Sequence, residues 1–311
     1  MDKITSKIGL IALFIGTFFL FLYLSFPYGV LKEALASQIQ LSTGMGVRIE
    51  ELGPAFPFGF NARQVELSGG GGGKVSFKRI GIRLSILQLL LLGIGVNIDI
   101  EAANKGSLDV DLKFGILRLV AGKQVLPSVI DLDAKSFPLD GIVSYALKHV
   151  VASGAGGAMA GPLLGALAFR GSLNGDVSIE LDSVAVSQST GSVNLKFTDA
   201  ALILSDPSIG LPDQVFKTAQ IKGAMAAGAL KIEPATRFIA DELEIGSDGK
   251  INIKNSFTAS DLDLKVMVKL TGGLGEKFGW VMDGLSGGAS KGGNLSLQVR
   301  GTIGSPVTSG L

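Results

Sequence analysis

The sequence predicts a mainly β protein, in which a single N-terminal transmembrane helix is followed by a long antiparallel, curved or groove-shaped β-sheet with a few short helices. Three observations favour this fold class. Residues 8–26 carry no charge, apolar and polar residues alternate with a period of two through much of the remaining chain, and 44 glycines supply turns. Alternation of this kind is typical of antiparallel strands with one apolar and one wet face.

The first predicted element is a transmembrane helix from Ile8 to Phe26, within a short N-terminal unit of residues 1–26. At about 1.5 Å per residue, this segment reaches roughly 28 Å, close to the ~30 Å hydrocarbon core of a bilayer. Lys3 and Lys7 precede it, so the positive-inside rule places residue 1 in the cytoplasm and the body outside. A cleaved signal peptide is the alternative, but its apolar region is usually shorter and ends at small residues, so we favour an uncleaved single-pass anchor.

A short amphipathic helix is expected next, at the membrane exit in residues 27–44. Val30, Leu31, Leu35 and Ile39 recur there with helical spacing, and Thr43-Gly44 ends the pattern. Residues 45–122 then alternate as the first part of the β body. A glycine run at 69–73 is interpreted as a flexible turn rather than a phosphate-binding loop, because the flanking residues do not fit that motif.

Residues 123–169 are predicted to interrupt the strands with a helical and Gly/Ala-rich insertion. Asp140 is positioned to cap a helix that runs to about Val151, and 152–168 is rich in glycine and alanine. A second membrane span is the alternative, because twenty uncharged residues lie between His149 and Arg170, but their five glycines and Pro162 make a poor apolar helix. A loop or helix that covers one end of the β body is therefore expected.

The second part of the β body is predicted over residues 170–311, where the alternation is sustained. Its cleanest stretch interleaves apolar residues with Asp263, Lys265, Met267 and Lys269. We select the apolar members of this stretch and of a later one as the candidate apolar groove or core face: Leu262, Leu264, Val266, Val268, Leu270, Leu295, Leu297 and Val299.

Composition argues against several function classes. Without Lys3, Lys7 and Asp2, the chain carries 26 basic and 26 acidic residues, so it lacks the basic surplus expected of a nucleic-acid binder. There is no cysteine, and His149 is the single histidine, so the usual zinc sites are not expected. Ser290 lies in a G-x-S-x-G match, but no histidine follows it to complete a hydrolase triad. We expect no enzyme activity, cofactor or metal.

The segment FPYGVLKEALASQIQLSTGMGVRIEELGPAFPFGFNARQVELSG, residues 26–69, resembles the opening of type II secretion system protein N (GspN) of Gram-negative bacteria. The ending RGTIGSPV, residues 300–307, is similar to the close of that family and of the broader AsmA-like envelope proteins. The resemblance implies an anchor in the bacterial inner membrane, a periplasmic β body, and other secretion-system or envelope proteins as partners. The AsmA-like likeness further implies a curved, groove-shaped sheet with an apolar concave face.

Two functions follow as expectations. The resemblance implies a structural or interaction component of the type II secretion system. The apolar stripe instead suggests a groove that binds or conducts lipid, with phospholipid as the ligand, because an apolar sheet face must be covered by something apolar. A closed β-sandwich core explains the alternation equally well. An open trough would favour lipid binding, and two sheets packed face to face would favour a scaffold.

Overall fold

The computed structural model describes most of the chain after residue 24. The described residues are 25–43, 46–56, 58–68, 74–85, 87–88, 93–115, 126–143, 167–182, 188–204, 213–254, 256–285 and 294–310, together with Phe14, Thr17 and Phe21. Among them there is no helix whose length and hydropathy would let it cross a membrane. Most of the predicted anchor at 8–26 lies outside the described residues, so the anchor stays a prediction.

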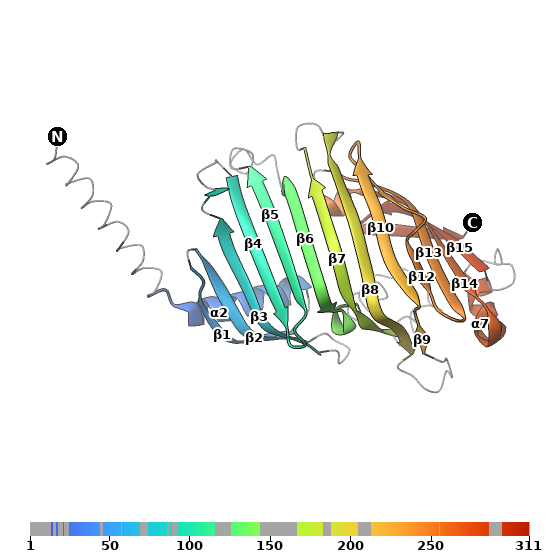
Figure 1. Ribbon diagram of the computed structural model, residues 1–311, viewed down its shortest axis with the longest axis horizontal. Coiled ribbons are helices and arrows are strands. Elements are labelled where there is room, and N and C mark those ends of the chain that lie inside the picture. The colour runs from blue at the N-terminus through green and yellow to red at the C-terminus, as the bar shows by residue number, and fades with distance from the viewer. Residues whose placement is uncertain are drawn as a thin grey trace.

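One antiparallel sheet of sixteen strands dominates the molecule (Figure 1). Its strands pair in chain order from β1 to β8 and continue through β10, β11, β13, β14, β15 and β16, while β9 pairs with β8, and β12 pairs with β10 and β13. The predicted mainly β fold, with a long antiparallel sheet and few short helices, is therefore confirmed. The strands are β1 (Gly46–Pro54), β2 (Gly59–Ser68), β3 (Lys74–Ser85), β4 (Gly93–Ala102), β5 (Ser107–Gly115), β6 (Val129–Pro138), β7 (Leu167–Glu180), β8 (Thr190–Leu204), β9 (Gln214–Val215), β10 (Thr218–Ala226), β11 (Ala229–Ile232), β12 (Arg237–Ile239), β13 (Leu243–Asn252), β14 (Asp261–Leu270), β15 (Asn294–Thr302) and β16 (Ser305–Gly310).

Two α-helices of the described chain lie at opposite ends of this sheet. The helix α2 (Tyr28–Thr43) forms where the amphipathic exit helix was predicted, and it contacts β1, where the Lys32 ammonium donates to the Glu50 carbonyl oxygen at 3.3 Å. The helix α7 (Gly272–Leu285) follows β14 and buries Leu274. Between β13 and β14 lies a short 3₁₀ turn, η3 (Phe257–Ala259).

The sheet is strongly curved: β4 to β8 face the viewer in Figure 1, whereas β14 and β15 run nearly across them at the right-hand end. Register shifts accompany this curvature in the pairings β3 with β4, β6 with β7, and β7 with β8. Ser136 and Asp199, which lie at two of these irregular places, have positive φ of 48° and 51°. Bulges of this kind bend a strand and increase its local twist, so they help to curve the sheet.

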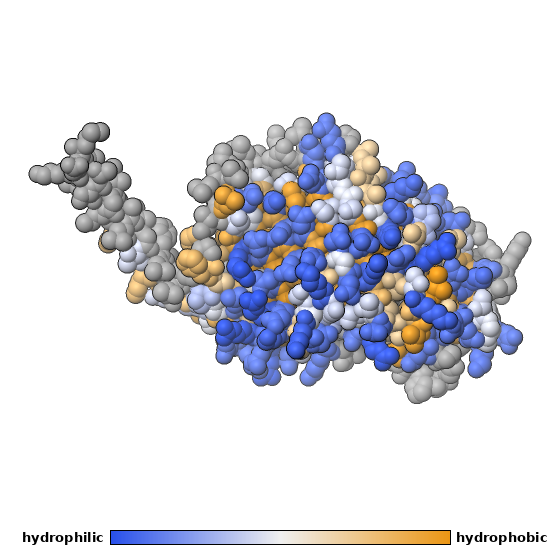
Figure 2. Space-filling view, in the orientation of Figure 1, coloured by the Kyte–Doolittle hydropathy of each residue, from blue (hydrophilic) through white to orange (hydrophobic). Residues whose placement is uncertain are grey.

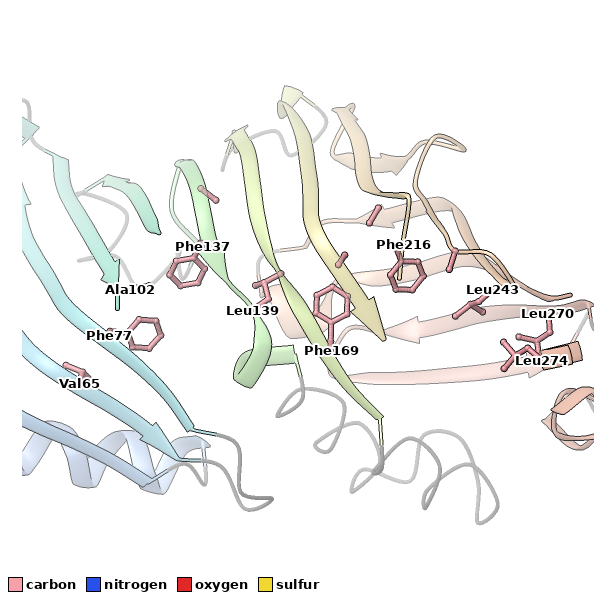
Figure 3. Packing of buried hydrophobic residues seen from close by; sticks show 14 of the residues in the cluster. Val65, Phe77, Ala102, Phe137, Leu139, Phe169, Phe216, Leu243, Leu270 and Leu274 are labelled. Atoms are coloured by element: carbon pink, nitrogen blue, oxygen red, sulfur yellow. The ribbon is translucent and has the colours of Figure 1, made fainter. Parts of the chain in front are cut away.

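The buried hydrophobic residues form a line across the sheet rather than a compact ball (Figure 3). Phe77 of β3 stacks on Phe137 of β6 with ring centroids 6.0 Å apart. Further along, Phe197 contacts both Phe169 and Phe238, at 6.2 and 5.2 Å. The line continues to Leu243, Leu270 and Leu274 at the other end of the sheet. This line is the hydrophobic core, and it occupies only part of the apolar face.

The predicted insertion at 123–169 is corrected at both of its ends. Residues 129–138 form β6, and β7 already begins at Leu167. The physical reason is that Ile130, Leu132 and Ala134 alternate with aspartates and pair in register with β5, so this segment extends the sheet. Helical residues do begin at Asp140, but the rest of the predicted helix and the segment 152–168 lie outside the described residues.

Candidate functional site

The candidate site is the part of the apolar face that the hydrophobic core does not cover. Because the strands are antiparallel and in register, residues from successive strands line up directly across the sheet. One such line crosses seven strands without a break. We call it the first apolar row, and it consists of Phe60, Ile82, Ile98, Val110, Leu132, Val177 and Val193.

A second apolar row runs beside the first, one step further along each strand. It consists of Leu84, Val96, Leu112, Ile130 and Ile179, again paired directly from strand to strand. Side chains two residues apart on a strand share a face, so the two rows form one continuous surface on β3 to β7. We refer to the two rows together as the open apolar face.

Burial distinguishes this face from the hydrophobic core. Leu84 is 40% exposed, and every other member of the two rows is half-buried rather than buried. Leu132 packs against the core cluster, but the remaining members lie outside the cluster and its packing partners. In a closed sandwich, the inner faces of two sheets interdigitate and the central apolar positions are buried. All sixteen described strands instead belong to a single sheet.

The residues selected from the sequence lie on β14 and β15, at the far end of the same sheet. Leu264 pairs with Val299, Val266 with Leu297, and Val268 with Leu295, so the two selected stretches lie side by side in register on neighbouring strands. Leu270 and Leu295 are buried and belong to the core cluster, whereas Leu262, Leu264, Val266 and Val299 are half-buried. Val268 and Leu297 are half-buried and pack against the cluster.

Two glycines interrupt the apolar line between the two regions. Gly223 of β10 follows Val193 in the register and precedes Ile232. Gly249 of β13 stands between Ile232 and Leu264. Its φ is +136°, and a Cβ placed there would lie 2.3 Å from the carbonyl oxygen of Asp263. Only glycine fits this backbone without strain. The longest uninterrupted apolar surface therefore lies over β2 to β8. Its residues are not among those selected from the sequence, although the alternation of apolar and polar residues in β4 and β5 indicates an apolar face there.

The opposite face of the same strands is polar and rich in carboxylates. Figure 2 shows many hydrophilic residues over β4 to β8 on the face toward the viewer, with hydrophobic residues visible between them. Asp99, Asp109, Asp133 and Asp176 stand directly opposite one another on four successive strands. Like charges opposed in this way are destabilising. Arg79 offsets part of the repulsion, because its guanidinium lies 3.1 Å from the Asp99 carboxylate.

Two lysine–carboxylate pairs on this polar face shift pKa values. The Lys78 ammonium donates to the Glu101 carboxylate at 2.6 Å, and this hydrogen bond lowers the pKa of Glu101 below its ordinary value of 4.5. The Lys135 ammonium donates to Asp133 at 2.7 Å, which raises the pKa of Lys135 above its ordinary value. Both pairs are solvent-exposed and are typical of a wet sheet face.

The residues considered for chemistry do not assemble into a reactive centre in the described part of the chain. No group of three or more His, Asp or Glu side chains there is arranged to hold a metal ion. His149 and Ser290 lie outside the described residues. Asp261 and Asp263 are held on the polar face by Lys254 at 2.7 Å and Arg300 at 3.8 Å. What the geometry offers is therefore an extended apolar surface.

The architecture defines a class: a protein whose described strands form one long, curved antiparallel sheet. Comparison of the chain with models of protein families, with curated proteins and with solved structures finds no match.

Proposed function

We propose that this protein binds the acyl chains of lipids along the open apolar face of its sheet, while residues 8–26 hold it in a membrane. One observation carries the proposal: two in-register apolar rows lie half-exposed on a sheet that has no second sheet packed against it among the described strands. Extended apolar surfaces on soluble domains mark binding sites. The ligand that matches a long, featureless aliphatic surface is a hydrocarbon chain.

The dimensions of the surface support an acyl-chain ligand. The first apolar row crosses seven strands, and at about 4.8 Å per strand spacing it extends roughly 29 Å. One acyl chain spans half of a ~30 Å hydrocarbon core, or about 15 Å. The row therefore has the length of about two such chains, and the neighbouring second row gives it width.

The composition of the two rows also supports this ligand. All twelve side chains are Phe, Leu, Ile or Val, and none of them brings a polar group to the surface. Polar headgroups then have no partner on the rows themselves, so the acyl chains rather than the headgroup are expected to provide most of the binding energy.

The proposed location of the protein in the cell is inferred from its sequence alone. The resemblance of residues 26–69 and 300–307 to a secretion-system protein and to AsmA-like proteins favours the periplasmic side of a bacterial inner membrane. A role as a structural component of the type II secretion system is a prediction from that resemblance alone. Lipid binding is the function that the geometry supports better.

The experiment compares lipid bound to the full chain and to two variants of β8. Val193→Asp places a carboxylate on the first apolar row, whereas Asn194→Asp places one at the next position, on the polar face. Each protein is purified in mild detergent, and the co-purified phospholipid is quantified by mass spectrometry. Lipid that surrounds the predicted anchor is the same in all three proteins, so differences report on the sheet.

We expect the wild-type chain and Asn194→Asp to carry similar amounts of phospholipid, and Val193→Asp to lose most of it while keeping its circular dichroism spectrum. Equal lipid on all three proteins would contradict the proposal. Unfolding of Val193→Asp alone would also contradict it, because it would place Val193 in a closed core.

A further inference from the structure

An apolar surface at one corner of the sheet, where β1 turns into β2 and β3 ends, adjoins the open apolar face and shares Leu84 with it. Four large apolar side chains are exposed there: Phe56 by 81%, Phe58 by 45%, Leu84 by 40% and Leu87 by 65%. We call these four residues the apolar corner. Figure 2 shows hydrophobic residues at this left-hand end of the body. Single exposed apolar residues are common on proteins, but a group of large ones marks an interaction surface.

The backbone brings the two parts of the apolar corner together. The amide of Leu84 donates to the carbonyl oxygen of Phe58 at 2.7 Å, and Gly59 pairs with Arg83 in the β2–β3 register. The amide of Ala55 donates to the Gly59 carbonyl oxygen at 3.0 Å, which closes the turn that displays Phe56. The aromatic side chains therefore project from a hydrogen-bonded turn at a sheet corner.

The direction of α2 places the start of this helix at the same corner. Two residues link α2 to β1, and the helix contacts that strand, so it runs back along β1 with its N-terminus toward Pro54. Eleven residues of helix before Thr43 rise about 16 Å, and four residues of strand after Gly46 rise about 14 Å, which agrees with the contact of Lys32 with Glu50. Continued to Tyr28, the same geometry reaches about Gly53.

The segment that precedes α2 indicates that a membrane surface covers this corner. Phe26 is 45% exposed, and its ring lies 5.3 Å from that of Tyr28. Residues 8–26 carry no charge and have the length of a membrane span. Only Pro27 separates the predicted anchor from α2. An anchor at residues 8–26 therefore brings the bilayer surface to the start of this helix, at the end of the sheet that carries the apolar corner.

We propose that the apolar corner inserts into the boundary between headgroups and acyl chains of the bilayer that residues 8–26 enter. Aromatic and leucine side chains favour this boundary, and a second contact besides the anchor fixes the orientation of the body. The β body then contacts the membrane surface through the end of the sheet formed by β1 to β3. This inference concerns the membrane contact and holds whether or not the open apolar face carries lipid.

The absence of cysteine from the whole chain makes a direct test possible. Phe56→Cys and Leu87→Cys are each labelled with the environment-sensitive fluorophore NBD in the full chain. Phe257→Cys is the matched control, because Phe257 is also an exposed phenylalanine, at 57%, but lies in η3 between β13 and β14 at the far end of the sheet. The labelled proteins are reconstituted into vesicles of phosphatidylethanolamine and phosphatidylglycerol, with and without doxyl-labelled lipid.

We expect the probes at positions 56 and 87 to emit at shorter wavelength in vesicles than in detergent-free buffer, and to be quenched several-fold more by doxyl lipid than the probe at 257. Equal, weak quenching at all three positions would overturn the proposal and would assign the corner to a protein partner or a second copy of the chain. Failure of the chain to enter vesicles would overturn it as well, whereas loss of lipid from Val193→Asp would not affect it.

Discussion

Two leucine truncations test whether the two parts of the apolar face differ as their burial indicates. Leu112 belongs to the second apolar row on β5 and is half-buried between Val96 and Ile130. Leu243 begins β13, is 6% exposed and belongs to the core cluster. The substitutions Leu112→Ala and Leu243→Ala remove the same atoms from two strands of one sheet, so their costs compare the two environments directly.

The magnitudes follow from what surrounds each side chain. Truncation of a buried leucine costs about 2 to 5 kcal/mol, because the lost transfer free energy adds to a cavity that the neighbours fill only partly. Leu112 has neighbours within the sheet, but it lies outside the core cluster and its packing partners. Its truncation opens no closed cavity and removes only part of the burial, so we expect a cost of about 1 kcal/mol.

The assay is urea unfolding of the full chain in detergent, monitored by far-ultraviolet circular dichroism. The free energies of unfolding are compared at a common m value, which is the dependence of that free energy on urea concentration. Leu243→Ala is expected to lower the transition midpoint clearly more than Leu112→Ala. If both substitutions cost the same, about 2 kcal/mol or more, Leu112 lies in a closed core and the two rows do not form a ligand-binding surface.

Three further predictions address the polar face and the interruption of the rows. Asp109→Asn is expected to raise the free energy of unfolding by roughly 0.5 kcal/mol at low salt, because Asp109 stands between two other aspartates. The gain should vanish in 1 M NaCl, where the repulsion is screened. A loss of stability at low salt would contradict this prediction. The lowered pKa of Glu101 stabilises the fold above pH 4.5, and this contribution is lost as the pH falls through the lower pKa of the folded state. Lys78→Gln removes the hydrogen bond that lowers this pKa, so the melting temperature of the variant should fall less steeply than that of the wild type below about pH 5. An unchanged dependence of melting temperature on pH would contradict a stabilising role of the Lys78–Glu101 pair. Gly249→Ala is expected to cost about 1 to 3 kcal/mol, since its φ is +136° and a Cβ would meet the Asp263 carbonyl oxygen, and a neutral result in the same urea assay would refute that strain.

Much of the fold could be predicted from the sequence because its elements depend on local patterns. Apolar and polar residues alternate in β4, β5, β14 and β15, and each forms as a strand with one apolar face. The helical spacing between residues 27 and 44 likewise marked α2 to within a residue. These patterns reflect the periods of strands and helices, so they can be recognised from neighbouring residues without reference to distant parts of the chain.

The strand β6 shows the limit of prediction from local patterns. In β6, Ile130 and Leu132 alternate with Asp131 and Asp133, as in the strands that were predicted. Its position just before Asp140 and the Gly/Ala-rich run nevertheless favours an insertion when the sequence alone is considered. Pairing with β5 on one side and β7 on the other determines its place in the sheet, and β7 lies far along the chain.

The bulges were beyond prediction for a different reason. Phe77 and Ile80 share the apolar face although they are three residues apart, because the register with β4 shifts between Phe77 and Arg79. A strict period of two would place them on opposite faces. The polar residues at the shift carry no distinctive signal, so the sequence does not reveal which strands bend. The extent of the open apolar face depends on these bends.

Photo-crosslinking locates bound lipid on the protein and so tests whether acyl chains bind along the open apolar face. A phospholipid with a diazirine in its acyl chain is added to the full chain in mild detergent, irradiated, and its attachment sites are mapped by peptide mass spectrometry. We expect crosslinks to concentrate on peptides of β4 to β8 that carry the rows, including those with Ile98, Val110 and Val177. Crosslinks confined to residues 8–26, with the sheet unlabelled, would contradict it.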